Sequence, residues 1–162
     1  TEEYSGSAWT AVTATPTKSQ TFQASGGTLT AGIYFGGEGG PGAKTSESFE
    51  YDGTNWTAGG DLNEATARNS GGGTLQTATM AVGGLTTSAG PGSAVTQLYD
   101  GTSWRTSASM AVARSQVGAF TGTTSSGLIN NGINASDAAI VTTEEFTGET
   151  TAVNAAKTID FD

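Results

Sequence analysis

The apolar residues of this chain occur in short runs, separated by segments rich in glycine, threonine and serine. Apolar side chains at alternate positions of such a run, for example Ile33 and Phe35, point to one face of an extended strand. Met80 and Val82 repeat this pattern further along the chain. No long segment places apolar residues at helical spacing, and glycine and β-branched residues disfavour a helix. The pattern therefore predicts an all-β protein.

A repeat of about 47 residues organises the sequence. An aromatic residue recurs after 47, 48 and 47 residues, at Tyr4, Tyr51, Tyr99 and Phe146. A tryptophan stands five residues after it in the first three units, at Trp9, Trp56 and Trp104, and Thr151 takes its place in the last. A short run that ends in glycine keeps the same spacing, with the sequences IYFGG, MAVGG and LINNG. We also align three basic residues at one position of the repeat, namely Lys18, Arg68 and Arg114.

Each unit is expected to form four short strands. The first follows the basic residue, as in Gln116–Phe120, and the second is the run that ends in glycine. The third covers Ser46–Tyr51 and the fourth begins at Trp56. Between them the sequence DGTN at Asp52–Asn55 is typical of a hairpin turn. Four antiparallel strands with a period near 50 residues are the pattern of one blade of a β-propeller.

By this count the chain is a single repeat domain, 1–162, of about three and a half blades. A half blade covers 1–18, two blades cover 19–67 and 68–113, and a terminal blade covers 114–162. Residues 157–161 alternate like a closing strand, which we expect to pair with an N-terminal strand of this chain or of another copy. Closed propellers have about 4–8 blades, so we expect blades upstream of Thr1, or copies of the chain, to complete the ring.

The order of these motifs resembles the kelch repeat, which has a basic residue, a strand closing in Gly-Gly, a strand with tyrosine, and a nearby tryptophan. The residues that carry the resemblance are Arg68, Gly83, Gly84, Tyr99 and Trp104. It covers essentially the whole chain and implies a kelch-like β-propeller array of four-stranded antiparallel blades. The threonine- and glycine-rich style, with the sequences YDGTNW and YDGTSW, is also similar to kelch-like arrays in tail proteins of marine bacteriophages.

Composition excludes several kinds of chemistry. The chain has a net charge of −9 and contains neither histidine nor cysteine. It therefore has no disulfide, no thiolate or histidine relay, and no ordinary zinc site. The acidic balance argues against nucleic acid and anionic membrane surfaces, and no apolar run is long enough for membrane insertion. The Asp-Gly turns lack the further oxygen ligands of a calcium loop. We expect no cofactor and no metal.

The repeated aromatic residues are expected to be structural. In a sequence with few large apolar side chains, an aromatic in each unit is best used to pack adjacent blades together. These residues are Tyr4, Trp9, Tyr51, Trp56, Tyr99, Trp104 and Phe146. The alternative is a set of tryptophan platforms that stack on sugar rings. The basic residues have a similar choice between an anion site and pairing with a carboxylate such as Glu50 or a loop carbonyl.

No catalytic residues are predicted. The adjacent pairs Glu2 with Glu3 and Glu144 with Glu145 occupy equivalent positions, but neighbours along a strand point to opposite faces, which separates each pair. The connections between second and third strands vary most between units, and variable loops on a rigid scaffold often carry binding function. The candidate binding residues in these loops are Glu38, Pro41, Lys44, Thr86, Pro91, Asn134 and Asp137.

These observations favour a non-enzymatic structural and adhesive module of a virion, in a phage tail or a capsid-surface fibre. Its partners would be other virion proteins or copies of itself, together with a host surface glycan or protein. The alternative is a lectin-like, carbohydrate-binding propeller that is secreted or displayed on a cell surface. A remnant of a copper oxidase or glycosidase propeller is disfavoured, because histidine and cysteine are absent.

Overall fold

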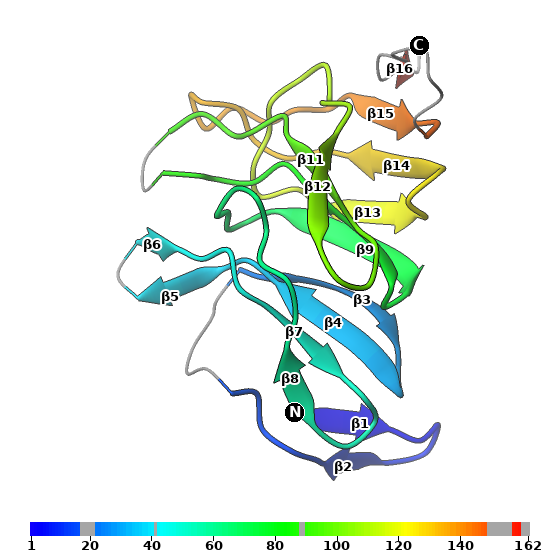
Figure 1. The fold of residues 1–162 in the computed structure, drawn as a ribbon. Helices are drawn as coiled ribbons and strands as arrows, with labels where there is room; N and C mark the ends of the chain where they lie inside the picture. Colours follow the sequence, from blue (N-terminus) through cyan, green and yellow to red (C-terminus); the bar gives the residue numbers. More distant parts are fainter. Residues whose placement is uncertain (17–21, 41, 88–89, 149–156, 160–162) are drawn as a thin grey trace.

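The structure is a computed structural model that describes residues 1–16, 22–40, 42–87 and 90–148, together with the backbone of 157–159. These residues form strands and turns without a helix, so the predicted all-β class is confirmed. Every strand pairing is antiparallel, and strands pair in chain order (Figure 1). In sheets with four strands, short turns join the first strand to the second, whereas longer connections join the second strand to the third.

The strands form four successive sheets and one small hairpin. Sheet 1 has two strands, β1 (Glu2–Tyr4) and β2 (Trp9–Ala11). Sheet 2 consists of β3 (Ala24–Thr28), β4 (Ala31–Phe35), β7 (Ser48–Tyr51) and β8 (Trp56–Ala58). Sheet 3 consists of β9 (Ser70–Leu75), β10 (Ala78–Val82), β11 (Thr96–Tyr99) and β12 (Trp104–Ser107). Sheet 4 consists of β13 (Ala119–Gly122), β14 (Gly127–Asn130), β15 (Thr143–Phe146) and β16 (Lys157–Ile159). The hairpin is β5 (Glu38–Gly40) with β6 (Ala43–Lys44).

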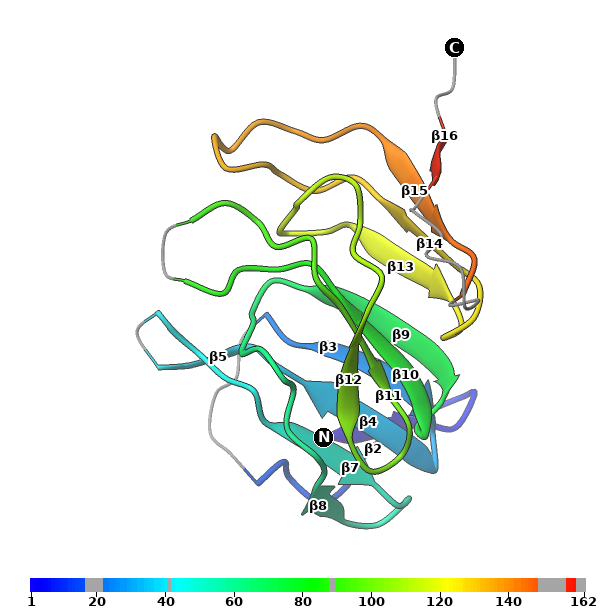
Figure 2. The same cartoon turned by 45° about the horizontal axis from the view of Figure 1, so that its top comes forward.

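The first strand of each four-stranded sheet lies beside the first strand of the next. Strands β3, β9 and β13 are therefore neighbours although they come from different sheets (Figures 1 and 2). Glycine makes this close approach feasible, as Gly71 of β9 illustrates. A Cβ atom at Gly71 would lie 2.7 Å from the ring of Phe35 in sheet 2 and 2.4 Å from the carbonyl oxygen of Met80. The glycine-rich composition thus supports the packing of one sheet on another.

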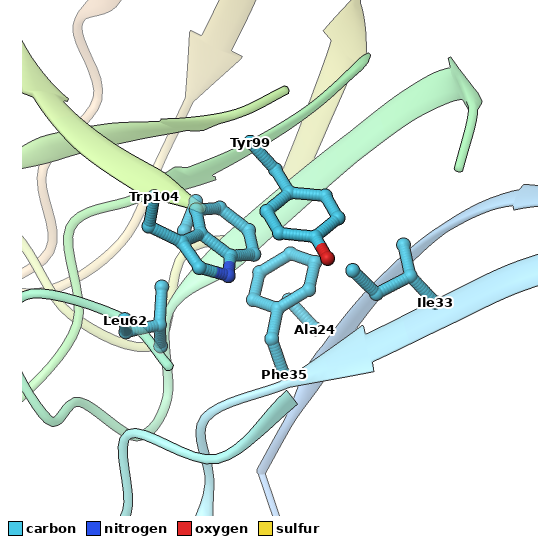
Figure 3. Packing of buried hydrophobic residues seen from close by; sticks show 7 residues of the cluster. Ala24, Ile33, Phe35, Leu62, Tyr99 and Trp104 are labelled. Atoms are coloured by element: carbon cyan, nitrogen blue, oxygen red, sulfur yellow. The ribbon is translucent and has the colours of Figure 1, made fainter. Parts of the chain in front are cut away.

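Two apolar clusters lie between neighbouring sheets. We call each contact between two neighbouring sheets a seam. The seam between sheets 2 and 3 is shown in Figure 3 and contains Ala24, Ile33, Phe35, Leu62, Ala81, Tyr99 and Trp104. The seam between sheets 3 and 4 contains Met80, Val82, Leu98, Met110 and Ile129, with Phe120 and Phe146 packed against them. The alternation in the sequence explains this, because Ile33 and Phe35 share the face of β4 that meets sheet 3.

A buried tyrosine links neighbouring sheets at two of the seams. The hydroxyl of Tyr51 donates a hydrogen bond to Oε1 of Glu3 in sheet 1, at 2.7 Å. The hydroxyl of Tyr99 donates to Oε1 of Glu50 in sheet 2, at 2.8 Å. Glu50, one of the alternatives considered as a partner for a basic residue, therefore accepts a hydrogen bond from the tyrosine of the next sheet. The repeated aromatic joins sheets by both its ring and its hydroxyl.

The tryptophans differ in burial more than their regular spacing suggests. Trp104 is 4% exposed and packs on Phe35 of the preceding sheet, with ring centroids 4.7 Å apart, as predicted. Trp56 is half-buried and packs on Tyr34 and Tyr51 of its own sheet. For Trp9 the prediction was wrong, because it is 68% exposed. Among the described residues, sheet 1 contains two strands, so it offers these rings less surface to pack against than a four-stranded sheet does.

The remaining aromatic positions also differ in burial. Tyr4 is 48% exposed, so its predicted burial was also wrong, and it touches Trp9 with ring centroids 5.2 Å apart. Tyr51 and Tyr99 are buried, as predicted. Phe146 is half-buried against the cluster between sheets 3 and 4. Burial of a repeated aromatic thus differs between sheets although the spacing is constant.

Two strand predictions need correction. The first strand of the last unit, expected at Gln116–Phe120, is β13 at Ala119–Gly122, because the backbone turns through a positive φ at Gln116. Within this chain the expected closing strand does not pair with an N-terminal strand, because β16 pairs with β15 and completes sheet 4. Pairing with a strand of another copy stays a prediction. The predicted turn at Asp52–Asn55 is confirmed, since Asp52 N donates to Asn55 O at 3.1 Å. Lys18 and Thr151 lie outside the described residues.

Candidate binding site at the mouth of the inner strands

The connections between second and third strands and the links between sheets gather at one end of the sheets. In a four-stranded antiparallel sheet, the connection between the second and third strands and the link to the next sheet lie at the same end. Figure 2 shows these segments projecting away from the hairpin turns. Backbone hydrogen bonds join them across sheets, from Gly37 N to Thr66 O at 2.8 Å and from Gly84 N to Arg114 O at 2.9 Å. We call this end the loop face.

Three residues at the loop face hold the same place in successive sheets. Phe22, Arg68 and Gln116 each precede the first strand of a sheet, and their φ angles are 61°, 56° and 49°. The amide of Arg68 donates to the carbonyl of Phe22, and the amide of Gln116 donates to the carbonyl of Arg68, both at 2.9 Å. Left-handed backbone is uncommon for such side chains, and strain of this kind gathers at functional sites.

We call the hydrogen bonds that join Phe22, Arg68 and Gln116 the main-chain ladder. It corrects the sequence alignment of the basic residues. Arg68 corresponds to Gln116, while Arg114 corresponds to Thr66, whose carbonyl accepts the same type of hydrogen bond. Arg68 and Arg114 therefore do not hold one shared position. The sequence alignment matched two arginines and was therefore wrong by two residues. The backbone conformation repeats at these positions, but the residue type does not.

Arg68 is held by two neighbours and keeps its terminal nitrogens available. Its guanidinium lies over the ring of Phe22, 4.8 Å from the centroid. Its Nε is 3.6 Å from Oε1 of Glu38, an ion-pair distance too long for a hydrogen bond. Among the described residues, no hydrogen bond to its two terminal nitrogens occurs. About a third of the side chain, 31%, is exposed.

Glu38 and Lys44, two predicted site residues, bind each other rather than facing solvent. Lys44 Nζ donates to Glu38 Oε1 at 2.7 Å across the β5–β6 hairpin. This hydrogen bond lowers the pKa of Glu38, and the charges of Lys44 and Arg68 lower it further, against the opposing effect of burial. The hairpin thus fixes a carboxylate beside Arg68 whose charge Lys44 already balances.

Asn69 follows Arg68 and is buried without a polar partner. The residue is 8% exposed. Within the described part of the chain, neither its Oδ1 nor its Nδ2 makes a hydrogen bond. An amide buried in this way is destabilising, since both groups lose their hydrogen bonds to water. Unpaired buried polar groups are few in folded proteins, so this one calls for an explanation.

Two adjoining clefts open around these side chains. The smaller, of about 250 Å³, is lined by Phe22, Gln23, Arg68, Asn69, Gln116 and Val117. The larger, of about 530 Å³, is lined by Arg68, Leu85, Gly90, Pro91, Ser115, Gln116, Ile133, Asn134, Ala135 and Asp137. They share Arg68 and Gln116, and so form one continuous surface. The cavity between sheets 3 and 4, at about 20 Å³, has room for no more than a water-sized molecule.

The larger cleft brings together three of the predicted site residues, Pro91, Asn134 and Asp137. The side chain of Asn134 organises its own turn, since its Oδ1 accepts from the amides of Ser136 and Ala138 at 2.9 and 3.1 Å. Asp137 is exposed in this turn with a φ of 56°. Thr86 does not line either cleft. Pro41 lies outside the described residues.

Sequence reasoning missed Phe22, Asn69 and Gln116. The spacing of Phe22, Arg68 and Gln116, 46 and 48 residues, follows the repeat and was available as a signal. The three residues are of different types, however, so no conserved residue type identifies this position of the repeat. Asn69 carries no signal in the sequence, because its missing partners become apparent only in the packed structure.

Arg114 has a structural role on the same face. It is fully buried and forms an ion pair with Glu144 of β15, which is 1% exposed. Its guanidinium also donates to the carbonyls of Asn131 and Thr142, each at 3.0 Å. The carboxylate of Glu144 accepts from the amides of Ala111 and Val112, at 2.6 and 3.1 Å. Each charge is therefore surrounded by hydrogen-bond partners, as burial requires.

The expected separation of the paired glutamates is confirmed. Glu144 is buried in its ion pair, whereas the adjacent Glu145 is half-exposed. Glu3 accepts from Tyr51, whereas Glu2 is exposed. Within the described ranges, no three acidic side chains group closely enough to hold a metal ion. Nor does the described chain contain a helix long and apolar enough to cross a membrane.

Comparison with known proteins informs the fold alone. No protein-family model matches this chain, and no curated protein matches it. Among solved structures, the chain is similar to the structure of YjhT, with a TM-score of 0.75 and 18% sequence identity. The similarity covers 94% of this chain and 49% of that chain, so the chain spans about half the length of the protein it matches.

Proposed function

We propose that sheets 1 to 4 are successive blades of a kelch-like β-propeller, with sheet 1 forming part of a blade. Three observations support this arrangement. Each complete sheet has four antiparallel strands in chain order. The first strands β3, β9 and β13 lie side by side. Equivalent residues of successive sheets, such as Phe22, Arg68 and Gln116, occupy equivalent backbone positions.

We further propose that the chain is a non-enzymatic structural and adhesive module of a virion, in a phage tail or capsid-surface fibre. Its loop face would contact a glycan or a protein on the host surface. The main support is the continuous pair of clefts at this face, because function concentrates on loops that a rigid scaffold positions. The lining offers amides, a hydroxyl, a carboxylate and a guanidinium, which suit recognition by hydrogen bonding.

A lectin-like module, secreted or on a cell surface, is the second candidate. The smaller cleft favours it, because Phe22 is 55% exposed and stands beside the amides of Gln23, Asn69 and Gln116. An aromatic ring and nearby amides suit a single sugar ring, which presents apolar faces and hydroxyls. A lectin would bind free monosaccharides or disaccharides. An adhesive module would need the extended polymer or protein of a host surface.

An array of purified bacterial lipopolysaccharides and capsular polysaccharides tests the adhesive function. We expect wild-type protein to bind some of these polymers. The double variant Asp137→Asn with Pro91→Ala, which changes the larger cleft, should lower the signal at least about fivefold. Asparagine tolerates the positive φ at position 137, so the fold should be retained.

Thr102→Ala is the matched control, because Thr102 lies in the turn between β11 and β12 at the opposite end of sheet 3. Its signal should equal that of the wild type. Equal loss in both variants, or retention in both, would contradict binding through the loop face. Binding of disaccharides as strong as that of the polymers would favour the lectin.

A further inference from the structure

The smaller cleft contains groups that the folded chain itself leaves unsatisfied. Both polar atoms of Asn69 are buried without a partner, and the terminal nitrogens of Arg68 make no hydrogen bond among the described residues. These side chains are adjacent in the chain and line the same cleft. Arg68 presents N–H donors to whatever occupies the cleft, and Asn69 adds an amide whose donor and acceptor are buried at the cleft wall. An occupant that paired with them would remove the cost of leaving Asn69 unpaired.

The backbone around the cleft is held in a conformation that its side chains do not favour. Phe22, Arg68 and Gln116 all line this cleft, and all have a positive φ. Inter-sheet hydrogen bonds between their main chains accompany this conformation, although the three side chains differ. Such over-determined strain preorganises a site before the ligand arrives, and preorganisation lowers the entropic cost of binding.

Charge indicates which kind of ligand the cleft accepts. The chain carries a net charge of −9, yet the smaller cleft has no acidic residue in its lining and one arginine. The nearest carboxylate described, Glu38, faces Nε of Arg68 and is already bonded to Lys44. The outer edge of the Arg68 guanidinium therefore remains for a planar anion, which it can bind with two parallel hydrogen bonds.

We infer that the smaller cleft binds a carboxylate carried by a hydroxylated ring, as in a uronic acid unit of an acidic polysaccharide. Arg68 binds the carboxylate, while Asn69 and Gln116 bind ring hydroxyls. The exposed face of Phe22 contacts the apolar face of the ring. This inference rests on the proposed binding function and adds the chemical class of the ligand.

The test compares two sugars that differ in one group. A disaccharide of glucuronic acid and its neutral glucose counterpart are titrated into the full chain, and binding is followed by two-dimensional NMR. We expect the acidic sugar to bind about tenfold more tightly, because a charged partner strengthens hydrogen bonds to arginine. Added salt should weaken binding of the acidic sugar and leave binding of the neutral sugar unchanged. Equal affinity of the two sugars would overturn the inference, and this comparison needs no variant.

Two variants then locate the site. Arg68→Gln should reduce the affinity for the acidic sugar about tenfold, to the level of the neutral one. Arg105→Gln is the matched control, since Arg105 is exposed on β12 and lines neither cleft. Equal loss with Arg105→Gln would attribute the effect to overall charge and overturn the inference.

Asn69→Leu replaces the amide by two methyl groups of similar shape. Because the amide has no partner in the free protein, the melting temperature should not fall, while affinity for both sugars should fall about fivefold or more. A large drop in melting temperature with unchanged affinity would show that Asn69 is structural and would overturn its role as a ligand group.

The outcomes separate this inference from the proposed function. Polysaccharide binding that is lost with the Asp137 and Pro91 double variant, but unaffected by Arg68→Gln and equal for neutral and acidic polymers, would refute the carboxylate site alone. Absence of binding to every polymer on the array and to both disaccharides would refute the proposed function as well.

Discussion

Leu98 and Phe146 hold, in the seam between sheets 3 and 4, the positions that Glu50 and Tyr99 hold in the seam before it. Where the tyrosine has a hydroxyl, the preceding sheet supplies a carboxylate. Where phenylalanine replaces tyrosine, leucine replaces the glutamate, and both join the apolar cluster. The polar pair has thus been exchanged as a unit, which avoids leaving either group buried alone.

The exchange should be reversible. Leu98→Glu alone places a carboxylate in an apolar seam and should destabilise the protein by about 3 kcal/mol or more. Adding Phe146→Tyr supplies the donor and should recover about 1–3 kcal/mol. Urea unfolding of the wild type, both single variants and the double variant gives the coupling energy. Strict additivity would show that the two positions do not form a pair.

The three tryptophans should differ in energetic weight despite their equivalent positions. Trp104→Ala should destabilise by about 3–5 kcal/mol, since the ring is buried against Phe35. Trp9→Ala should change the free energy of unfolding by less than about 0.5 kcal/mol, because the ring is mostly exposed. Trp56→Ala should fall between them. Denaturant midpoints measure the series, and equal losses at all three positions would contradict the described burial.

The buried pair of Arg114 and Glu144 has a neutral counterpart one sheet earlier. There Thr66 takes the place of Arg114, and Gln97 takes the place of Glu144 and accepts from the amide of Glu64 at 3.2 Å. Glu144→Gln alone leaves the arginine uncompensated and should cost about 3–5 kcal/mol. The double variant Arg114→Thr with Glu144→Gln restores the neutral arrangement and should be more stable than this single variant. A double variant less stable than Glu144→Gln would contradict the equivalence.

Alkaline pH should weaken the seams. Burial and the hydrogen bond to Glu50 raise the pKa of Tyr99 to about 12, and the hydrogen bond to Glu3 raises the pKa of Tyr51 to about 12. Because these pKa values lie above the ordinary value near 10, the stabilisation is complete below pH 10 and is lost as pH rises towards 12. Melting temperature against pH measures this loss, and tyrosinate absorbance follows the titration.

The Tyr51→Phe and Tyr99→Phe double variant is the control for this pH dependence. It should show a smaller decline above pH 10, because two of the titrating hydroxyls are gone. From about pH 6 to 8 the melting temperatures of both proteins should be nearly independent of pH, since the chain has no histidine. A steep change in that interval, or an unaltered alkaline decline in the double variant, would contradict this account.

Features that depend on local chemistry were predictable from the sequence. The turn at Asp52–Asn55 forms as predicted because Gly53 takes a φ of 88° and the Asp52 carboxylate accepts the amides of Thr54 and Asn55. The fourth strand begins at Trp56, as predicted. Alternation correctly placed Ile33 and Phe35 on one face of a strand, and both belong to the same buried cluster. Each of these needs only a few neighbouring residues.

Features that depend on other sheets were not predictable. The exposure of Trp9 and the burial of Trp104 differ because of the strands beside them, and the repeat spacing is the same for both. The binding prediction placed Glu38 and Lys44 in a variable loop, but could not show that they would bind each other and hold Arg68. Asn69 became a candidate only because packing leaves its amide without a partner.

The main-chain ladder through Phe22, Arg68 and Gln116 separates architecture from recognition. Its hydrogen bonds use amides and carbonyls, so the three side chains are free to differ, and they do: one is aromatic, one cationic and one an amide. A repeat protein built this way can exchange its recognition residues one sheet at a time while the scaffold stays constant. Under the proposed binding function, a change of ligand would then require substitutions at a few equivalent positions, selected among residues that tolerate a left-handed backbone.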